Sequence, residues 1–366
     1  MQGSLNILFL HSIGKAKFGG GEKWLLNAAE GLKNKGHTIY VGGRPGSVLL
    51  EKASQRGLQT AGFNILSDLS PYHVFKIASF IKKQSIDVLI TRDRDLAVGG
   101  LAARVAGNTT VLVRHGLPLR SSFRKHSFLL RRLADGLITN TRTIRDFYQE
   151  KGVADKEFVK VIYNGIEPED HSPSFDFKKQ FPGKKVVLTS CRLAPQKGLF
   201  YLIDAIGLLK NECRDLVFFV LGQGKLYGKL KAYAEKKGVS DMIRFEGFVE
   251  NVRPYLKGCD IFILPSLYEG MPNAAMEAMA CGRPVVLTEV NGSKELVPDE
   301  SVGMLIPPRD AEAIAGAVKK LAGDRELSDR LGRNARRYVL ENFTVAQMIS
   351  SLELYIKDKR MLKRGT

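Results

Sequence analysis

The stretch IFILPSLYEGMPNAAMEAMACGRPVVLTEV, residues 261–290, contains two apolar runs separated by a helical pattern. The runs IFILPS (261–266) and PVVLTEV (284–290) have the length and apolar content of buried strands. A helix is expected over 273–280, with Gly282 at its C-terminal cap. Continuous apolar strands that alternate with helices are typical of a buried parallel sheet covered on both faces.

The same alternation continues along the whole chain. In the first half we expect strands at 6–13, 38–43, 87–92, 110–116, 136–141 and 158–164. In the second half we expect them at 185–193, 217–224, 243–248, 261–266, 284–290 and 303–308. Amphipathic segments such as 20–36 and 198–212 lie between them. The chain is therefore predicted to be an α/β protein with parallel sheets.

A length of 366 residues exceeds a single core of ordinary size. The stretch 166–185 holds three prolines and no hydrophobic period, which indicates a linker. We predict two doubly wound, Rossmann-like domains that face a central cleft: 1–165, and 186–345 after the linker. A C-terminal helix over 346–366 is expected to cross back to the first domain. In such folds ligands bind at the carboxyl ends of the strands.

The composition is that of a globular protein with an excess of bases. Apolar residues make up 44% of the chain, the net charge is +18, and no apolar run is long enough to span a bilayer. The first 150 residues carry 22 Lys and Arg against 10 Asp and Glu. Such a field attracts phosphate-rich partners or anionic lipid. The start MQGSLNILFLHSI reads as a first strand, and the four cysteines as reduced thiols in a cytoplasm.

Two cations follow the strand expected at 185–193. In CRLAPQKG (191–198), Arg192 and Lys197 are five residues apart on a turn that leads into a helix. Together with the amides of the helix N-terminus they are able to hold a polyanion. Solvated surface cations are the alternative for this motif alone.

Two further turns follow strands of the second half. Gly222 and Gly224 permit a close backbone approach to a ligand, and Phe248 and Val249 offer backbone groups to a nucleobase edge. Simple turns without a ligand are the alternative for both.

The two carboxylates of EGMPNAAME lie eight residues apart. Glu269 is expected on the loop after a strand, and Glu277 about one turn into the following helix. The residues between them, Gly270, Met271, Pro272 and Asn273, lead into the helix N-terminus, where backbone amides favour an anion. Carboxylates accept hydrogen bonds from the paired hydroxyls of sugars. A ligand with a sugar, a diphosphate and a ribose would use all of these groups at once.

This set of motifs resembles the retaining GT-B glycosyltransferases of family 4 (glycosyl transferases group 1). The resemblance rests on CRLAPQKG at 191–198, the glycine turn at 222–224, GFV at 247–249 and the pair Glu269 and Glu277. It implies that Arg192 and Lys197 hold the donor diphosphate, that Glu269 contacts the transferred sugar and that Glu277 holds the ribose. Cys191 stands where the family usually has Ser.

The first half contributes two more candidate sites. Gly19, Gly20 and Gly21 open a helix and offer amides to a phosphate of the donor, although a flexible turn is the alternative. His115 ends a strand, where a structural role is common. The family resemblance implies instead that His115 lines the sugar pocket, and we count it with the catalytic residues.

Three residues of the first half are candidates for the acceptor side: Asp93, Asp95 and Arg120. Asp93 and Asp95 also match a D-x-D metal motif. Because Arg192 and Lys197 would neutralise the diphosphate, we expect no metal ion. Solvated loop charges are the alternative for the Asp pair.

A basic helix is expected after Arg120. Arg124, Lys125, Arg131 and Arg132 share one of its faces, and apolar residues take the other. Such a face suits docking on an anionic membrane. An ordinary solvated helix is the alternative, and no nucleic-acid motif accompanies the charge.

The sequence therefore predicts a retaining, metal-independent glycosyltransferase without a cofactor. A UDP- or GDP-sugar is the expected donor, and a cell-envelope glycolipid or saccharide is the expected acceptor. We expect the protein in the cytoplasm, peripheral on the inner face of the membrane. The alternatives are a nucleotide-sugar epimerase, a phosphorylase, which normally needs pyridoxal phosphate, and a non-catalytic sugar-nucleotide or lipid-binding subunit.

Overall fold

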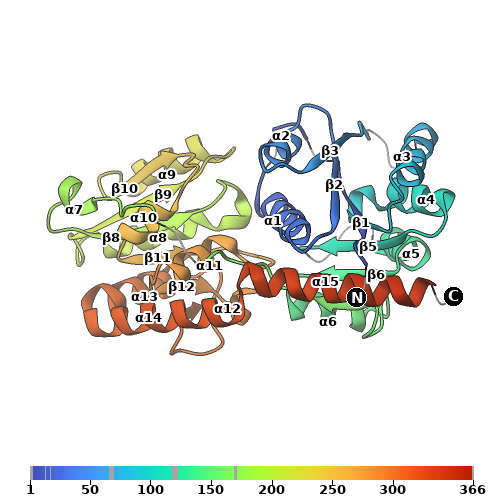
Figure 1. Ribbon diagram of the computed structural model, residues 1–366. Helices are drawn as coiled ribbons and strands as arrows, with labels where there is room; N and C mark the ends of the chain where they lie inside the picture. Colours follow the sequence, from blue (N-terminus) through green and yellow to red (C-terminus); the bar gives the residue numbers. More distant parts are fainter. Residues whose placement is uncertain are drawn as a thin grey trace. The chain divides into compact units, whose positions relative to one another are not determined.

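The structure, a computed structural model, describes residues 3–12, 14–16, 18–65, 70–117, 123–168 and 171–364. The chain divides into two compact units (Figure 1): Met1–Gly165 together with Val345–Thr366, and Ile166–Thr344. Each unit contains one sheet in which every strand pair is parallel. The prediction of two doubly wound α/β domains is confirmed.

The first unit has seven strands within its described residues, in the order β3-β2-β1-β4-β5-β6-β7. They are β1 Asn6–His11, β2 Thr38–Gly43, β3 Gln59–Gly62, β4 Val88–Arg92, β5 Thr110–His115, β6 Gly136–Thr139 and β7 Val159–Val161. Its helices are α1 Gly20–Asn34, α2 Val48–Gln55, α3 Pro71–Lys83, the short η1 Asp93–Asp95, α4 Leu96–Ala106, α5 Phe123–Leu133, α6 Arg142–Glu150 and α15 Val345–Arg364.

Side chains alternate between the two faces of this sheet, and helices cover both. On one face, Phe9 of β1 belongs to a buried cluster with side chains of α1, α2 and α15. On the other, Leu8 of β1 belongs to a cluster with side chains of α3, α4, α5 and α6. Strands buried on both faces need continuous apolar runs, which explains why the sequence marked them so clearly.

Strand β3 was not predicted from the sequence. Its four residues, Gln59–Gly62, contain no apolar run, and the strand pairs with β2 at the edge of the sheet. An edge strand exchanges hydrogen bonds with only one neighbour, and this one is largely exposed, so the sheet demands little apolar content from it.

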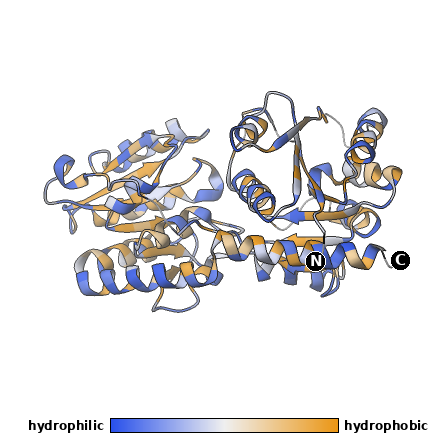
Figure 2. Ribbon diagram, viewed as in Figure 1, coloured by the Kyte–Doolittle hydropathy of each residue, from blue (hydrophilic) through white to orange (hydrophobic). Residues whose placement is uncertain are grey.

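The second unit has six strands within its described residues, in the order β10-β9-β8-β11-β12-β13. They are β8 Lys185–Ser190, β9 Leu216–Leu221, β10 Ile243–Gly247, β11 Ile261–Leu264, β12 Val285–Thr288 and β13 Met304–Ile306. Its helices are α7 Phe177–Gln180, η2 Pro195–Lys197, α8 Leu199–Leu209, α9 Tyr227–Lys237, α10 Arg253–Gly258, α11 Asn273–Ala280, α12 Ser293–Leu296, α13 Ala311–Gly323 and α14 Arg325–Asn342. Figure 2 shows that the strands are mainly hydrophobic, whereas α14 carries many hydrophilic residues.

Residues 166–185, predicted to form a linker, lie within the second unit. Phe175 stacks on Tyr255 with ring centroids 4.4 Å apart, and Phe177 packs edge-on against Phe219 at 4.8 Å. These aromatic contacts pack Phe175 and Phe177 against α10 and β9. The prolines and mixed charges of this segment leave no hydrophobic period, so the sequence pattern does not predict these aromatic contacts.

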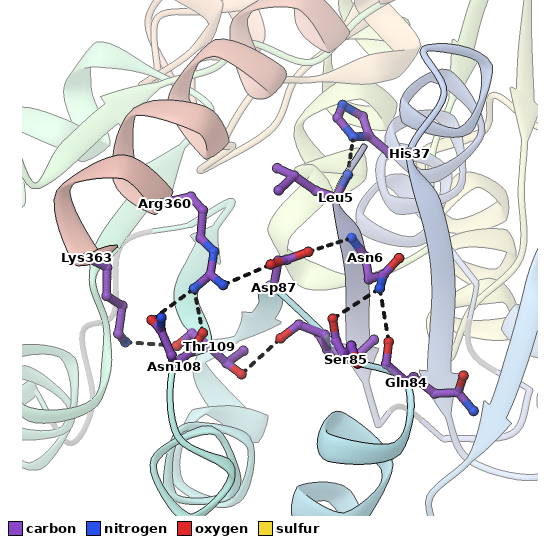
Figure 3. A network of polar contacts seen from close by, with 11 residues as sticks. Leu5, Asn6, His37, Gln84, Ser85, Asp87, Asn108, Thr109, Arg360 and Lys363 are labelled. Atoms are coloured by element: carbon purple, nitrogen blue, oxygen red, sulfur yellow. Dashed lines mark hydrogen bonds and ion pairs between the residues drawn. The ribbon is translucent and has the colours of Figure 1, made fainter. Parts of the chain in front are cut away.

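Helix α15 belongs to the first unit, although it follows the whole second unit in the chain. Leu352 and Ile356 are buried in the same cluster as Trp24 of α1. Farther along α15, polar side chains tie it to the amino ends of the strands (Figure 3). Arg360 donates to Asp87 Oδ1 at 2.8 Å, and Asp87 Oδ2 accepts the amide of Asn6 at 3.0 Å.

Replacement of Asp87 by alanine is expected to destabilise the first unit by about 3 kcal/mol. The change leaves Arg360, whose side chain is 9% exposed, without its carboxylate, and it leaves the amide of Asn6 without its acceptor. Urea unfolding would measure the loss. The matched control is Glu30→Ala, which removes the partner of Arg56 in a far more exposed pair of the same unit. An equal change in both variants would contradict the prediction.

Among the described residues, no helix is long and apolar enough to cross a membrane.

Candidate functional site

The second sheet brings together two segments that are far apart in the sequence. Strands β8 and β11 are neighbours, and the strand order reverses between them. The turn with Arg192 and Lys197 follows β8, and the loop with Glu269 follows β11. Both segments therefore leave the carboxyl edge of the sheet at its switch point, where doubly wound folds bind ligands.

Lys197 and Glu269 form an ion pair in which Lys197 Nζ donates to Glu269 Oε1. Their side chains are 16% and 8% exposed. In a pair with so little exposure, removal of either partner would leave the other charge poorly solvated. The sequence predicted roles for both residues, but not that they touch.

The loop between β11 and α11 is held from both sides. On one side, the amide of Leu267 donates to the carbonyl of Gln196 at 2.7 Å, and Gln196 Nε2 donates to the carbonyl of Tyr268 at 2.8 Å. On the other side, Asn291 Nδ2 donates to the carbonyl of Glu269 at 2.8 Å. Hydrogen bonds on both sides therefore fix the conformation of this loop.

Helix α11 begins where the loop ends. Pro272 is its N-cap residue, and no side chain caps the helix. The positive end of the helix dipole at this terminus favours an anion. Of the residues predicted around this end, Met271 and Pro272 are buried and Asn273 is half-buried. Glu277 is half-buried in the second turn of α11. Lys197, Glu269 and the N-terminus of α11 thus all follow the carboxyl ends of the neighbouring strands β8 and β11.

Two predicted donor-side residues are exposed. Arg192 lies in the turn after β8, and no partner is found for its guanidinium among the described residues. Phe248, just after β10, leaves 67% of its surface exposed, which is unusual for a phenylalanine. Val249 beside it is half-buried. An exposed cation and an exposed ring are both able to contact a nucleotide.

Gly222 and Gly224 allow the turn after β9 to lie close to the backbone of the turn after β8. A Cβ at Gly222 would lie 1.9 Å from the carbonyl oxygen of Cys191, and one at Gly224 would lie 2.3 Å from that of Leu193. The two loops are also joined by a bond from the amide of Leu193 to the carbonyl of Gln223 at 3.0 Å. The neighbouring turn of Arg192 thus already requires these glycines, whether or not a ligand also approaches them.

Replacement of Gly222 by alanine is expected to destabilise the second unit by about 3 kcal/mol. Its φ of +133° disfavours any side chain, and the new Cβ would overlap a backbone oxygen that cannot move aside easily. Thermal or urea unfolding would measure the loss. Gly228→Ala, in α9, is the matched control, because a Cβ there meets nothing within 4 Å. The prediction fails if both variants are as stable as the wild type.

The N-terminus of α1 in the first unit contains the glycines predicted to meet a phosphate. Gly19 is the N-cap residue without a side-chain cap, and Gly20 and Gly21 begin the helix. A Cβ at Gly21 would lie 3.5 Å from Arg92 Nη1, so the Arg92 guanidinium lies close to this helix end.

A buried pair of polar side chains, His11 and Glu22, stabilises the same helix end. The sequence analysis did not predict it. His11 Nε2 donates to Glu22 Oε1 at 2.6 Å, and Arg92 contacts the same oxygen at 3.4 Å. Burial lowers the pKa of His11. Burial raises the pKa of Glu22, but the hydrogen bond from His11 and the charge of Arg92 outweigh it, so the net pKa is lowered. A neutral imidazole therefore donates to an ionised carboxylate.

His115 is buried at the end of β5, with both ring nitrogens occupied. Its Nδ1 is 2.6 Å from the hydroxyl of Tyr148, and its Nε2 is 3.2 Å from Nε2 of His126. Burial lowers the pKa of His115 to about 3, so the imidazole is neutral. The contact with a sugar that we predicted for His115 would require one of these bonds to break.

The candidates for the acceptor side differ in exposure. Asp95 is buried, its Oδ2 accepts the amide of Ser12 at 2.8 Å, and burial raises its pKa to about 7. Its carboxylate thus supports the end of β1 and is not presented at the surface. Asp93 is half-buried and remains a candidate. Arg120 lies outside the described residues.

The predicted basic surface is on α5. Arg124, Lys125, Arg131 and Arg132 are exposed, and the guanidinium of Arg132 lies 5.6 Å from the ring centre of Phe128. Phe128 is itself 61% exposed. The opposite face of the helix is buried through His126, Leu130 and Leu133. The predicted division of α5 into a basic and a buried face is therefore present.

Comparison with known proteins adds to this geometry. Residues 172–338 match the sequence profile described as Glycosyl transferases group 1, and residues 18–170 match the profile described as Glycosyltransferase Family 4. A curated relative from Escherichia coli, UDP-Gal:alpha-D-GlcNAc-diphosphoundecaprenol alpha-1,3-galactosyltransferase, is 29% identical over 304 residues, which cover 77% of this chain and 78% of that relative. Other curated relatives match over about half of their own length or less.

Solved structures with low sequence identity share the fold. HepE from Anabaena, crystallised in complex with UDP and glucose, matches with a TM-score of 0.86 at 22% identity, over 97% of this chain and all of that one (100%). Sucrose-phosphate synthase from Thermosynechococcus elongatus matches with a TM-score of 0.80 at 20% identity, over 99% of this chain and 100% of that one.

Proposed function

The chain belongs to the GT-B glycosyltransferases of family 4 and group 1, and from this premise we propose that it transfers a hexose from a nucleotide diphosphate to an acceptor hydroxyl with retention of the anomeric configuration. The observation that carries the proposal is the buried Lys197–Glu269 pair at the switch point of the second sheet, beside the uncapped N-terminus of α11.

The donor diphosphate binds through charge. Lys197 and Arg192 contribute cations, and the first amides of α11 contribute hydrogen-bond donors and the positive end of a helix dipole. Phe248 and Val249 border the nucleobase, and Glu277 accepts from the ribose. We favour a UDP-sugar, because the Escherichia coli relative is named for UDP-Gal and HepE was crystallised with UDP.

In the reaction the bond between C1 of the sugar and the diphosphate oxygen breaks, and the acceptor oxygen forms a new bond to C1 on the same face. Negative charge develops on the leaving diphosphate, where Lys197, Arg192 and the α11 amides stabilise it. The acceptor proton passes to a leaving phosphate oxygen. Glu269 orients the sugar through its hydroxyls. In this proposal the two cations and the helix N-terminus supply the charge that a metal ion would otherwise provide, and no cofactor takes part.

The acceptor proposed here is a glycolipid or saccharide intermediate of the cell envelope. Support comes from the Escherichia coli relative, whose named acceptor carries a diphosphoundecaprenol group, and from the exposed bases of α5. With Phe128 among them, these bases suit an anionic membrane surface. The protein would then work at the inner face of the membrane.

Donor specificity is the first test. We would measure nucleotide release from UDP-, GDP- and ADP-sugars in the presence of EDTA and without acceptor. Slow release of UDP from one UDP-hexose is the expected result. A second assay, with a lipid-linked or saccharide acceptor added, would establish retention if the product of the α-linked donor is itself α-linked. Release that needs a divalent metal would contradict the metal-independent mechanism. Binding of a nucleotide sugar without turnover, even when lipid-linked acceptors are added, would favour a binding subunit.

Membrane docking has a separate test. Sedimentation with vesicles that contain anionic lipid should exceed sedimentation with neutral vesicles. Replacement of Arg124 and Lys125 by glutamine should weaken vesicle binding by about five-fold for each base removed. No preference for anionic vesicles would refute this part of the proposal and leave the transferase activity untouched.

A further inference from the structure

The carboxylate of Glu269 is held through one of its two oxygens. Ser266 Oγ donates to Oε1 at 2.7 Å, and Lys197 Nζ donates to the same atom. Ser266 is buried, with 1% of its surface exposed. Among the described residues, Oε2 has no hydrogen-bond partner. A carboxylate oxygen offers two lone pairs, so Oε1 is saturated by the protein while Oε2 keeps its full accepting capacity.

The backbone of Glu269 is held by a second group of contacts, from the loop after β12. Asn291 Nδ2 donates to the carbonyl of Glu269 at 2.8 Å, and the amide of Gly292 donates to the carbonyl of Gly270 at 3.1 Å. Two successive peptide groups are thus clamped by two successive residues of another loop. The direction in which the Glu269 side chain leaves the backbone is fixed by this clamp.

Asn291 adopts a backbone conformation that most residues avoid. Its φ is +27°, one of three positive values for non-glycine residues in the described chain. Such a conformation is unfavourable and persists only where surrounding contacts enforce it. Glycine would adopt it more easily but has no side chain to donate to Glu269. Asparagine at this position therefore has a less favourable backbone conformation than glycine would have, but it supplies the hydrogen bond to the Glu269 carbonyl.

We propose that Ser266 and Asn291 are positioning residues that present Oε2 of Glu269 to a hydroxyl group of the transferred sugar. The inference rests on the proposed function and adds two residues to it. When the donor diphosphate binds, Lys197 gains a second anion to neutralise, and its hold on Glu269 weakens. Ser266 contacts the carboxylate of Glu269 and Asn291 contacts its backbone carbonyl, and no other charged side chain bonds to either residue in the described structure. Both are therefore expected to keep the carboxylate in place through the reaction.

The prediction for Ser266 separates sugar positioning from nucleotide binding. Ser266→Ala should lower kcat/KM for the better of UDP-glucose and UDP-galactose by roughly 10- to 100-fold, the effect of losing one hydrogen bond to a charged group. Affinity for UDP alone should stay within about two-fold, because UDP lacks the transferred hexose that Glu269 is proposed to contact. A merely structural role for Ser266 would lower both quantities together, because the same loop leads into the N-terminus of α11.

Asn291 offers a test in which activity changes more than stability. Asn291→Gly relieves the positive φ but removes the bond to the Glu269 carbonyl and makes the unfolded chain more flexible, so the free energy of unfolding should fall by about 1 kcal/mol or less. Without the Nδ2 donor, kcat/KM should nevertheless fall about 10-fold. The control is Asn334→Ala, which removes another asparagine amide that donates to a backbone carbonyl, that of Ser301 at 2.9 Å, on exposed α14. Its kcat/KM should equal that of the wild type.

Three results would overturn the inference: unchanged kcat/KM in Ser266→Ala and Asn291→Gly, a parallel loss of UDP affinity, or an equal loss in Asn334→Ala. Wild-type protein that neither binds UDP nor releases it from UDP-glucose or UDP-galactose would overturn the UDP-sugar transferase proposal itself. The two failures are thus distinguishable, since the first leaves an active wild type.

Discussion

Replacement of Lys197 by alanine is expected to lower kcat/KM by about 10³-fold, at the upper end of what the loss of one stabilising donor produces. Two effects act together. The leaving diphosphate loses a cation, and Glu269, whose side chain is 8% exposed, is left without its counter-charge beside the position of that diphosphate. Affinity for UDP should therefore fall as well, by roughly 10- to 100-fold.

The same change should destabilise the second unit by about 3 kcal/mol, because it leaves one charge of a buried pair unpaired. The double variant Lys197→Ala/Glu269→Ala removes both charges and should recover part of this stability without recovering activity. Lys319→Ala is the matched control, since it breaks an ion pair with Glu212 in which both side chains are 59% exposed. Equal behaviour of Lys197→Ala and Lys319→Ala in unfolding and turnover would show that the buried pair has no special role.

Replacement of Glu269 by glutamine is expected to abolish most transfer but to preserve nucleotide binding. Glutamine has the same shape and no charge, and its amide group cannot replace both accepting oxygens. We expect kcat/KM to fall by at least about 10²-fold. Affinity for UDP should stay the same or rise, because Lys197 no longer shares its charge with a carboxylate.

The opposite responses of UDP affinity in the two variants are the diagnostic result. Isothermal titration with UDP, alongside steady-state kinetics on the UDP-hexose that the wild type accepts, would measure both. A loss of UDP affinity in Glu269→Gln equal to that in Lys197→Ala would assign Glu269 to the diphosphate and not to the sugar. Full activity in Glu269→Gln would remove Glu269 from the site altogether.

Much of the fold follows from local patterns in the chain. Apolar runs mark the strands that are buried on both faces, and amphipathic segments mark the helices between them, since each pattern reflects the burial of its own segment. The prediction missed β3, Gln59–Gly62, because an exposed edge strand needs no such run. It took 166–185 for a linker because the contacts of Phe175 and Phe177 are with aromatic rings about 40 to 80 residues away, at Phe219 and Tyr255.

Local sequence patterns predicted only part of the candidate site. Strand-end residues such as Lys197 and Glu269 stand out because turns at the carboxyl ends of parallel strands carry ligand-binding groups. Ser266 and Asn291 carry no such signal, since a serine in a loop and an asparagine before a glycine are common turn residues. Their roles depend on contacts with Glu269 that span 3 and 22 residues.

The sequence alone determined that this protein is a pair of parallel α/β domains with its chemistry at the strand ends, because hydrophobic period and turn residues are local properties. The tertiary structure decided which of these ends meet. Only the strand order places β8 beside β11, so that Lys197 reaches Glu269, and only the packing of α5 and α6 encloses His115 between His126 and Tyr148. The physical reason is that the hydrophobic periodicity of a segment reflects only how that segment is buried, whereas contacts between segments depend on which strands pair.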